Sequence, residues 1–341
     1  MALAAALRPF GFSSRLPLAR SAITSPLRST QHRSVSLSSY LVTPKELNEA
    51  LKKNVRTKIS TSPRVIPLCA TWFMPNDPAK RTGIEAFKKC RIPHARFFDL
   101  DEVKDHDSPY PHMLPTQEGF QEAMQSLGIR RDDELVVYDS EEAGLFSAPR
   151  VGWTLRVFGH NNVHVLNNFK LWVEEGYPTE SGEVAPEERS NYEVGDFNPA
   201  MVAHFAEMKE IAQDFGKEGS EGIQILDARP EGRFTGKDKE PRPGLPSGHM
   251  PGSTSLPFPV LLDPVTKALL PPSELRKILE ARGIDPTKPT ISSCGTGVTA
   301  AVIDLALQEA NVPPENRRIY DGSWTEWAQR VTEASGLIRK T

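Results

Sequence analysis

The feature that most constrains this chain is an internal repeat, because four kinds of segment occur in the same order in its two halves. The matched segments are residues 64–73 with 223–234, 91–100 with 249–258, 134–140 with 289–295, and 163–178 with 317–330. Their spacing also agrees: Asp139 stands 28 positions before Asn167, and Cys294 stands 27 positions before Asp321. A repeat of this length predicts two structurally equivalent units.

Each half alternates short, apolar, strand-like runs with helix-like stretches, which is the pattern of parallel α/β units. We therefore predict an α/β fold with tandem domains of about 130 residues, each a small, mainly parallel sheet flanked by helices. The predicted domains are residues 41–178 and 201–336, joined by a linker at 179–200 in a stretch rich in Pro, Gly, Ser and charged residues. Residues 235–252 form a second irregular stretch inside the second unit, and long loops of that kind are often functional.

The N-terminus differs in composition from the rest of the chain. Residues 1–45 contain five arginines and many serines, and the first acidic residue is Glu46. Such a leader is typical of a mitochondrial presequence, so residues 1–40 are predicted to direct the protein to the mitochondrial matrix. A disordered tail without an address is the alternative. A cytosolic fraction of the protein is compatible with both interpretations.

Composition excludes several classes of function. The net charge of −3 gives no bulk attraction for nucleic acid, and no apolar stretch approaches the roughly 20 residues that cross a bilayer. The three cysteines, at positions 69, 90 and 294, lie too far apart for a zinc motif and are too few for a disulfide framework. We therefore expect a protein of a reducing compartment that needs no metal or organic cofactor and binds neither nucleic acid nor membrane.

The chemistry is predicted to reside in the loop that follows an apolar run ending at Cys294. Gly295 and Gly297 allow a tight turn whose backbone N–H groups face inward, and a helix-like run begins at once at Ala300. The N-terminus of that helix adds partial positive charge, which favours the thiolate form of Cys294. The same N–H donors would stabilise a persulfide anion. Hydroxyl donors are added by Thr296 and Thr299.

Two other interpretations of this loop compete with a reactive cysteine. A free cysteine is usually a small buried apolar residue, but such a residue does not need a glycine-lined loop. Cys69 and Cys90 lack these surroundings, so the structural interpretation is favoured for them. A tyrosine-phosphatase-like site needs an arginine six positions after the cysteine. That position is Ala300, which argues against phosphate-ester hydrolysis.

Residues 294–300, CGTGVTA, resemble the active-site loop of the 3-mercaptopyruvate sulfurtransferases, which belong to the two-domain rhodanese family. Thiosulfate-specific rhodaneses usually have Arg and Lys in the two positions after the cysteine, where this chain has Gly295 and Thr296. The resemblance extends to residues 97–115, 146–160, 227–258 and 320–328, and so covers nearly everything from residue 41 to residue 329. It implies a fungal mitochondrial type of sulfurtransferase that carries sulfur as a persulfide on Cys294.

The resemblance also implies roles for residues outside that cysteine. Arg233 and Arg242 match arginines that bind the carboxylate of a small substrate. Asp101, His112 and Thr296 match a proton-handling set, in which a carboxylate orients an imidazole that serves a hydroxyl group. The family often has Ser at the position of Thr296. The loop residues implied to bind the substrate or its anionic sulfur are Gly295, Gly297, Val298 and Thr299.

The first repeat departs from the catalytic pattern. Ser140 is expected to be the counterpart of Cys294, and Glu141 and Glu142 beside it would repel an anionic substrate. The first domain is therefore predicted to be catalytically silent. Cys69 stands where relatives often have Asp, and we expect no catalytic role for it.

The implied reaction begins when the Cys294 thiolate attacks the sulfur of 3-mercaptopyruvate, a small anionic donor, and pyruvate leaves. The persulfide then passes to cyanide or to a thiol acceptor, such as thioredoxin or a cysteine of a partner protein, with ping-pong kinetics. Two alternatives stay open. One is thiosulfate as the preferred donor. The other is a relay protein that hands persulfide to a partner, since residues 165–169 are reminiscent of fungal members linked to tRNA thiolation.

Overall fold

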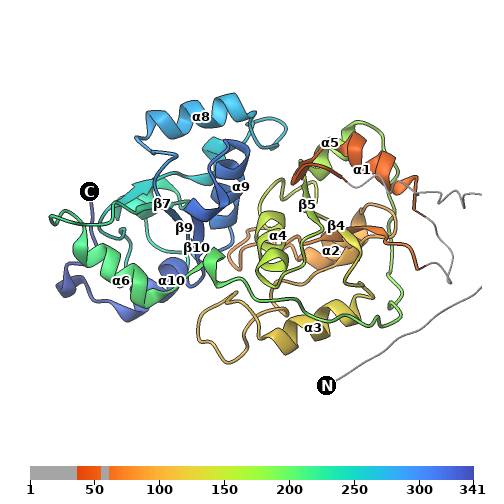
Figure 1. Ribbon diagram of the computed structural model, residues 1–341, viewed down its shortest axis with the longest axis horizontal. Helices are drawn as coiled ribbons and strands as arrows, with labels where there is room; N and C mark the ends of the chain where they lie inside the picture. The colour runs from red at the N-terminus through yellow and green to blue at the C-terminus, as the bar shows by residue number, and fades with distance from the viewer. Residues whose placement is uncertain (1–36, 55–60) are drawn as a thin grey trace, which may run out of the picture. The chain divides into compact units, whose positions relative to one another are not determined.

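The computed structural model describes residues 37–54 and 61–341, so the predicted targeting leader falls almost entirely outside the described residues. The described chain forms two five-stranded sheets, each flanked by helices (Figure 1). This architecture confirms the predicted class of fold, tandem α/β domains with parallel sheets. Within the described ranges, no helix is long and apolar enough to cross a membrane.

The first sheet is built from residues 41–166, and its strands are all parallel to their neighbours. The strands are β1 (Leu41–Val42), β2 (Val65–Cys69), β3 (Arg96–Phe97), β4 (Glu134–Tyr138) and β5 (Val163–Leu166). Their spatial order is β1-β5-β4-β2-β3. The helices of this domain are α1 (Pro44–Leu51), α2 (Gly83–Lys89), α3 (Gln117–Ser126), α4 (Ala148–Val157) and α5 (Phe169–Glu174).

The second sheet repeats this plan between residues 202 and 320. Its strands are β6 (Val202–Ala203), β7 (Gln224–Asp227), β8 (Ser253–Ser255), β9 (Thr290–Ser293) and β10 (Arg317–Tyr320). The order β6-β10-β9-β7-β8 is equivalent to that of the first sheet, again with parallel pairing. The helices are α6 (Phe205–Asp214), α7 (Glu231–Thr235), α8 (Pro272–Ala281), α9 (Ala300–Glu309) and α10 (Ser323–Arg330).

Both faces of each sheet are covered, because successive strand residues point to opposite sides. In β2, Ile66 and Leu68 belong to the hydrophobic cluster that includes α3 and α4, while Val65 and Cys69 belong to the cluster that includes α1, α2 and α5. The second sheet has α8 and α9 on one face and α6 and α10 on the other (Figure 1). Nearly continuous apolar runs in the strands follow from this double burial.

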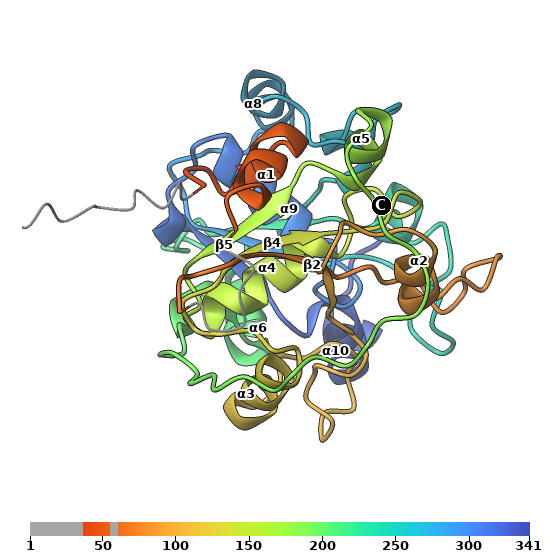
Figure 2. The same ribbon diagram turned by 90° about the vertical axis from the view of Figure 1, so that its right-hand side faces the viewer.

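Helices α4 and α9 pack against each other across the boundary between the two domains, which belong to one compact unit of the chain. Val151 and Leu155 of α4 lie in the same hydrophobic cluster as Val302 of α9. A partly buried ion pair between Arg156 and Asp304, with Nη2 and Oδ2 3.2 Å apart, adds a polar contact between these helices. In Figure 2 the helices α4 and α9 overlap with the strands β4 and β5 in projection, and Figure 1 shows the two helices side by side between the sheets. The second domain therefore packs against the helix that follows β4.

Backbone hydrogen bonds fix the correspondence between the two repeats. The Ala70 N–H donates to the Tyr138 carbonyl and the Ala228 N–H donates to the Ser293 carbonyl, each at 2.8 Å. Tyr138 and Ser293 are therefore equivalent, so the counterpart of Cys294 is Asp139. The expectation that Ser140 holds this position was wrong by one residue, because side-chain polarity alone does not determine the register of a strand.

The stretch predicted as a linker lies along the first domain. Between α5 and Pro199 the chain has no helix and makes only one isolated bridge, between Arg91 and Glu180. Tyr192 within it is fully buried, and its hydroxyl lies 3.0 Å from Nδ1 of His160. The connection is thus an extended chain held by side chains rather than by regular structure.

Candidate active site

Cys294 directly follows β9 and stands six residues before α9 begins. Its side chain is almost entirely buried, and it is a free cysteine. The Cys294 N–H donates to Oγ of Ser323 at 3.1 Å, and the Cys294 carbonyl accepts from the N–H of Trp324 at 2.9 Å. The N-terminus of α10 therefore fixes the backbone of the cysteine on one side, while the strand fixes it on the other.

The loop after Cys294 is rich in unused hydrogen-bond donors. No described residue accepts a hydrogen bond from the backbone N–H groups of residues 295–299. Buried N–H groups without an acceptor are rare in folded proteins. Together with the N-terminus of α9, these donors form a site that favours a small anion next to the sulfur of Cys294.

A chain of hydrogen bonds crosses from the first domain to this loop. The Oγ1 of Thr296 lies 3.1 Å from Nδ1 of His112, and Nε2 of His112 lies 3.1 Å from Oδ1 of Asp101. The indole Nε1 of Trp72 donates to the other carboxylate oxygen of Asp101 at 2.9 Å. The three residues of the predicted proton-handling set are therefore brought together, although two of them belong to the first domain.

The surroundings of His112 favour its neutral form. Burial lowers the pKa of His112 below its ordinary value, while the hydrogen bond to Asp101 opposes this shift. The same hydrogen bond, from the other side, lowers the pKa of Asp101, although partial burial opposes it. The indole of Trp72 meets the imidazole edge-on, with ring centres 4.7 Å apart. A neutral imidazole beside a carboxylate can accept a proton and be stabilised as it does so.

Arg233 lies at the rim of the Cys294 loop, in α7. A Cβ atom built on Gly295 would lie 3.3 Å from Nη2 of Arg233. The guanidinium is also paired with Glu240, since Nη2 lies 2.5 Å from Oε2 of that carboxylate. Arg233 thus reaches the loop but shares its charge with a neighbouring acid, which the sequence did not reveal.

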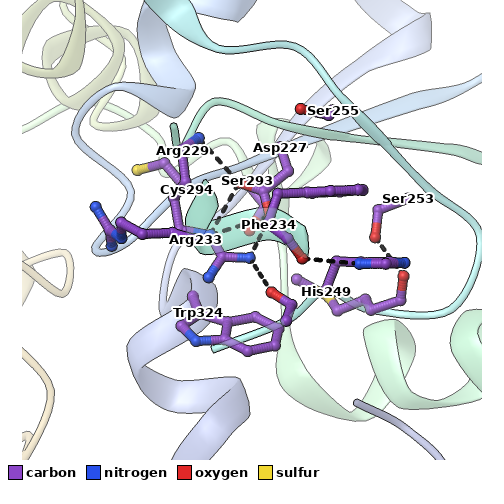
Figure 3. A network of polar contacts seen from close by, with 12 residues as sticks. Asp227, Arg229, Arg233, Phe234, His249, Ser253, Ser255, Ser293, Cys294 and Trp324 are labelled. Carbon is purple, nitrogen blue, oxygen red and sulfur yellow. Dashed lines mark hydrogen bonds and ion pairs between the residues drawn. The ribbon is translucent and has the colours of Figure 1, made fainter. Parts of the chain in front are cut away.

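Glu240 connects Arg233 to a second, deeper ion pair. Its Oε1 lies 2.8 Å from Nη1 of Arg229, whose Nη2 lies 2.6 Å from Oδ2 of Asp227. The guanidinium of Arg229 also stacks on Trp324, 4.0 Å from the ring centre. Figure 3 labels Asp227, Arg229, Arg233 and Trp324 of this network near Cys294. The alternating charges are buried and hold the loop 236–252 close to the end of β7.

Arg242 lies in the same loop and is half-buried. Burial lowers the pKa of Arg242, and repulsion by Arg233 adds to this shift. Attraction to Cys294, Glu240 and Asp101 opposes it. Arg242 therefore lies within electrostatic range of Cys294 and of Asp101. Unlike Arg233, it forms no ion pair with a described residue.

The last two loop residues open the following helix. The Val298 carbonyl accepts from the Ala301 N–H at 3.2 Å, and the Thr299 carbonyl accepts from the Val302 N–H at 3.1 Å. The side chain of Val298 is buried in the main hydrophobic cluster. These contacts anchor the end of the loop to α9, while the backbone N–H groups of Val298 and Thr299 have no acceptor among the described residues.

In the first domain the equivalent loop contains its own anion. The carboxylate of Asp139 accepts hydrogen bonds from the N–H groups of Phe146, Ser147 and Ala148 at 2.8, 2.9 and 2.8 Å. The Ser147 hydroxyl donates to its other oxygen at 2.5 Å. Asp139 therefore places its carboxyl group at the N-terminus of α4 and leaves no thiol there, and burial raises the pKa of this carboxyl group while its hydrogen bonds oppose the shift. The absence of a thiol supports the prediction of a catalytically silent first domain more directly than repulsion by Glu142, whose carboxylate pairs with Lys89.

The other two cysteines have surroundings unlike those of Cys294. Burial raises the pKa of Cys69 to about 12, and its sulfur lies 3.2 Å from Oγ1 of Thr71. Burial also raises the pKa of Cys90. Both shifts disfavour the reactive thiolate. In the described part of the chain, no group of His, Cys, Asp and Glu side chains has the arrangement of a metal site.

Sequence reasoning missed four residues at this site, namely Trp72, Arg150, Glu240 and Asp321. Trp72 and Arg150 come from the first domain, so no local pattern near Cys294 includes them. Arg150 donates through Nη2 to Oδ1 of Asp321 at 2.6 Å. A charged residue in the first turn of an otherwise buried helix was the available signal, because buried arginines are rare unless they are paired.

The pattern of the rhodanese-like domain family matches residues 208–330, which include β7 to β10 and the Cys294 loop. The thiosulfate sulfurtransferase TUM1 of Saccharomyces cerevisiae is 44% identical to this chain over 275 residues, which cover 77% of this chain and 88% of that one. The chain therefore belongs to the rhodanese family, and it is a sulfurtransferase.

Further comparisons agree with this assignment. A probable 3-mercaptopyruvate sulfurtransferase of Schizosaccharomyces pombe is 36% identical over 302 residues, covering 88% of this chain and 96% of that one. The crystal structure of the Tum1 protein from Saccharomyces cerevisiae superposes with a TM-score of 0.76 at 40% identity, covering 88% of this chain and 97% of that one. The sulfur transferase subunit of the yeast mitochondrial complex I superposes with a TM-score of 0.78 at 36% identity, covering 89% of this chain and all of that one.

Proposed function

We propose that this sulfurtransferase takes sulfur from 3-mercaptopyruvate, holds it as a persulfide on Cys294 and passes it to a thiol or to cyanide. The observation that carries this proposal is the chain of hydrogen bonds from Thr296 through His112 to Asp101. Loss of sulfur from 3-mercaptopyruvate leaves an enolate that must gain a proton, whereas thiosulfate leaves sulfite, which needs none. A proton relay next to the cysteine therefore suits the first donor better.

The proposed transfer conserves atoms and charge. His112, through Thr296, takes the thiol proton of the donor as the Cys294 thiolate attacks the donor sulfur. The carbon–sulfur bond then breaks and its electron pair stays on the carbon as the enolate of pyruvate. The relay returns the proton to that carbon, so pyruvate leaves and Cys294 retains a persulfide anion. The free N–H groups of residues 295–299 stabilise this anion.

We assign Arg242 and Arg233 to the carboxylate and keto oxygens of the donor. Arg242 has its charge available, while Glu240 offsets much of the charge of Arg233. Such a site offers less positive charge than two free arginines. It therefore favours a donor whose carboxylate is its main negative charge over thiosulfate, which carries two.

The donor proposal predicts that kcat/KM for 3-mercaptopyruvate exceeds that for thiosulfate by at least about tenfold. Thiosulfate is the second candidate donor, because the yeast relative at 44% identity is named a thiosulfate sulfurtransferase. Steady-state assays with both donors and one shared acceptor measure the ratio. A ratio in favour of thiosulfate overturns the choice of donor and leaves the persulfide on Cys294 intact as a proposal.

The relay predicts a defined pH dependence. Activity requires neutral His112, so kcat should fall as the pH decreases through the pKa of His112. This fall, the acid limb of the pH profile, should lie below the ordinary histidine range because burial lowers the pKa of His112. Asp101 raises that pKa. The substitution Asp101→Asn should therefore move the acid limb of kcat to lower pH and reduce kcat by about tenfold.

An exposed acid of the same loop provides the control for this measurement. Asp107→Asn should leave the pH profile and kcat unchanged, because Asp107 is exposed and lies outside the hydrogen-bond chain. If Asp101→Asn leaves the acid limb where it is in the wild-type enzyme, His112 is not the group that limits the rate at low pH.

A persulfide relay to a partner protein is the third candidate function. It is supported by the structural relative that is described as a sulfur transferase subunit of the yeast mitochondrial complex I. Both views require sulfur on Cys294, but only the relay requires a lasting complex with a protein acceptor. Isolation of the protein from its own cells, followed by identification of co-purified proteins, separates the two views.

We further propose that residues 1–40 direct the protein to the mitochondrial matrix. The mitochondrial relative and the five arginines of an acid-free leader support this address. A fusion of residues 1–40 to a fluorescent protein should enter mitochondria, and the protein that starts at residue 41 should stay in the cytosol. Cytosolic fluorescence of the first fusion would refute the address.

A further inference from the structure

Arg150 is a buried cation at the boundary between the two domains, and none of the steps above uses it. It lies in the first turn of α4, and only 1% of its side chain is exposed. Its guanidinium lies 4.6 Å from the ring centre of Trp153. Nη2 makes all of its hydrogen bonds, since Nε and Nη1 have no partner among the described residues. Burial of a charge with two unused donors costs free energy, and a buried ion pair is by itself weak evidence of a stabilising role.

The hydrogen bonds of Arg150 hold the chain around His112. Nη2 donates to the backbone carbonyl of His112 at 2.5 Å and to Oδ1 of Asp321 at 2.6 Å. The other oxygen of Asp321 accepts from the N–H of Leu114 at 2.8 Å. This ion pair therefore fixes the backbone on both sides of Met113. His112 itself has a φ of +62°, a conformation that side chains with a Cβ rarely adopt unless their surroundings impose it.

The same guanidinium lies against the Cys294 loop. A Cβ atom built on Gly297, whose φ is +76°, would lie 2.6 Å from Nη1 of Arg150 and 2.7 Å from the carbonyl of Asp321. Only glycine leaves room for this approach. Gly297 directly follows Thr296, so Arg150 bonds to the backbone of His112 on one side of the hydrogen bond between Thr296 and His112 and lies close to Gly297 on the other side.

Arg150 also acts on the charge of the imidazole. The charged groups that face His112 are Asp101 from its own loop, Arg150 from α4 and Arg242 from the loop before β8. Burial lowers the pKa of His112 most, both arginines lower it further, and Asp101 raises it. Removal of Arg150 should therefore raise this pKa, which is the direction opposite to that expected for removal of the Asp101 charge.

We propose that Arg150 is a positioning residue for sulfur transfer, which holds His112 of the first domain and Gly297 of the second in register so that the imidazole faces Thr296. This inference rests on the proposed function, because it assigns Arg150 to the relay that serves the reaction on Cys294. The first domain, whose own loop is predicted to be catalytically silent, would thereby support the catalytic activity of the second domain.

The test compares Arg150→Met and Arg150→Lys with the wild-type enzyme. Arg150→Met should lower kcat by about 10- to 100-fold with a change in KM below about threefold, because positioning is lost while the substrate-binding arginines remain. Its acid limb should move to higher pH. Arg150→Lys keeps the charge and should keep the acid limb in place, with an intermediate kcat. Arg156→Met is the matched control: it removes another ion pair between the domains from α4, and it should leave the pH profile unchanged.

Removal of Arg150 alone leaves Asp321 buried and unpaired, which can prevent folding. The double variant Arg150→Met, Asp321→Asn avoids that charge and should show the same loss of kcat. Wild-type kcat in the double variant or in Arg150→Lys, or an effect confined to KM, would overturn the inference. Mass spectrometry of the wild-type enzyme after 3-mercaptopyruvate is added provides the separate check: absence of sulfur on Cys294 there refutes the proposed function, whatever the Arg150 variants do.

Discussion

Replacement of Cys294 by Ser is expected to abolish sulfur transfer, with a fall in kcat of at least about a thousandfold. A serine hydroxyl is a far weaker nucleophile than a thiolate near neutral pH, and it cannot form a persulfide. The fold should be unaffected, because the change replaces one buried atom in a loop that the backbone bonds to Ser323 and Trp324 hold in place. Steady-state assays give kcat, and intact-protein mass spectrometry after incubation with 3-mercaptopyruvate reports the sulfur adduct.

Cys90 offers the matched control for this experiment. It is partly exposed, and burial raises the pKa of its thiol. Cys90→Ala should keep both wild-type turnover and the added mass of one sulfur atom. A sulfur adduct that survives in Cys294→Ser, or turnover that persists in it, would assign the chemistry to another cysteine.

Replacement of Arg229 by Met is expected to have the largest effect on stability, lowering the free energy of unfolding by about 3–5 kcal/mol. Arg229 is the only described partner of Asp227 in an ion pair, and it shares Glu240 with Arg233. Only 1% of the Asp227 side chain and 3% of the Glu240 side chain are exposed, so water cannot replace the lost cation. Denaturant unfolding followed by circular dichroism measures the change.

Lys277→Met provides the control for that loss. Lys277 pairs with Glu274 on α8, and both side chains are largely exposed. Removal of an exposed pair should leave the unfolding midpoint unchanged within error, because water solvates the remaining charge. If Arg229→Met is as stable as Lys277→Met, the buried network does not contribute to folding and Arg229 serves another purpose.

The repeat in the sequence predicted most of the fold. Alternation of apolar runs with helical stretches specifies parallel strands covered on both faces, and the two sheets share one strand order. The position of Cys294 at the end of a strand and before a helix was predicted for the same reason. The counterpart Asp139 was missed, because hydrogen bonds between strands, which the sequence does not display, decide which residue of one loop matches which residue of the other.

The sequence predicted individual residues of the candidate site, but not the contacts that join residues from different loops. Arg233 was predicted to bind the substrate, but its pairing with Glu240 was not, because it depends on how the loop 236–252 folds back toward α7. His112 and Asp101 were assigned through family resemblance, since nothing in their own segment indicates that they reach a cysteine almost two hundred residues away. Arg150 gave only a weak signal, a charged residue in the first turn of an apolar helix, because its contacts are with the His112 carbonyl and with a carboxylate of the other domain.

The two equivalent loops also differ in what completes them. In the first domain, the covalently attached carboxyl group of Asp139 accepts hydrogen bonds from three backbone N–H groups at the start of α4. In the second domain the corresponding donors, in residues 295–299, are left without an acceptor among the described residues. The proposed persulfide anion on Cys294 would therefore take the place in the second domain that the Asp139 carboxyl group has in the first. The transferred sulfur would then complete the hydrogen bonding of the loop after Cys294 only while the cysteine carries it.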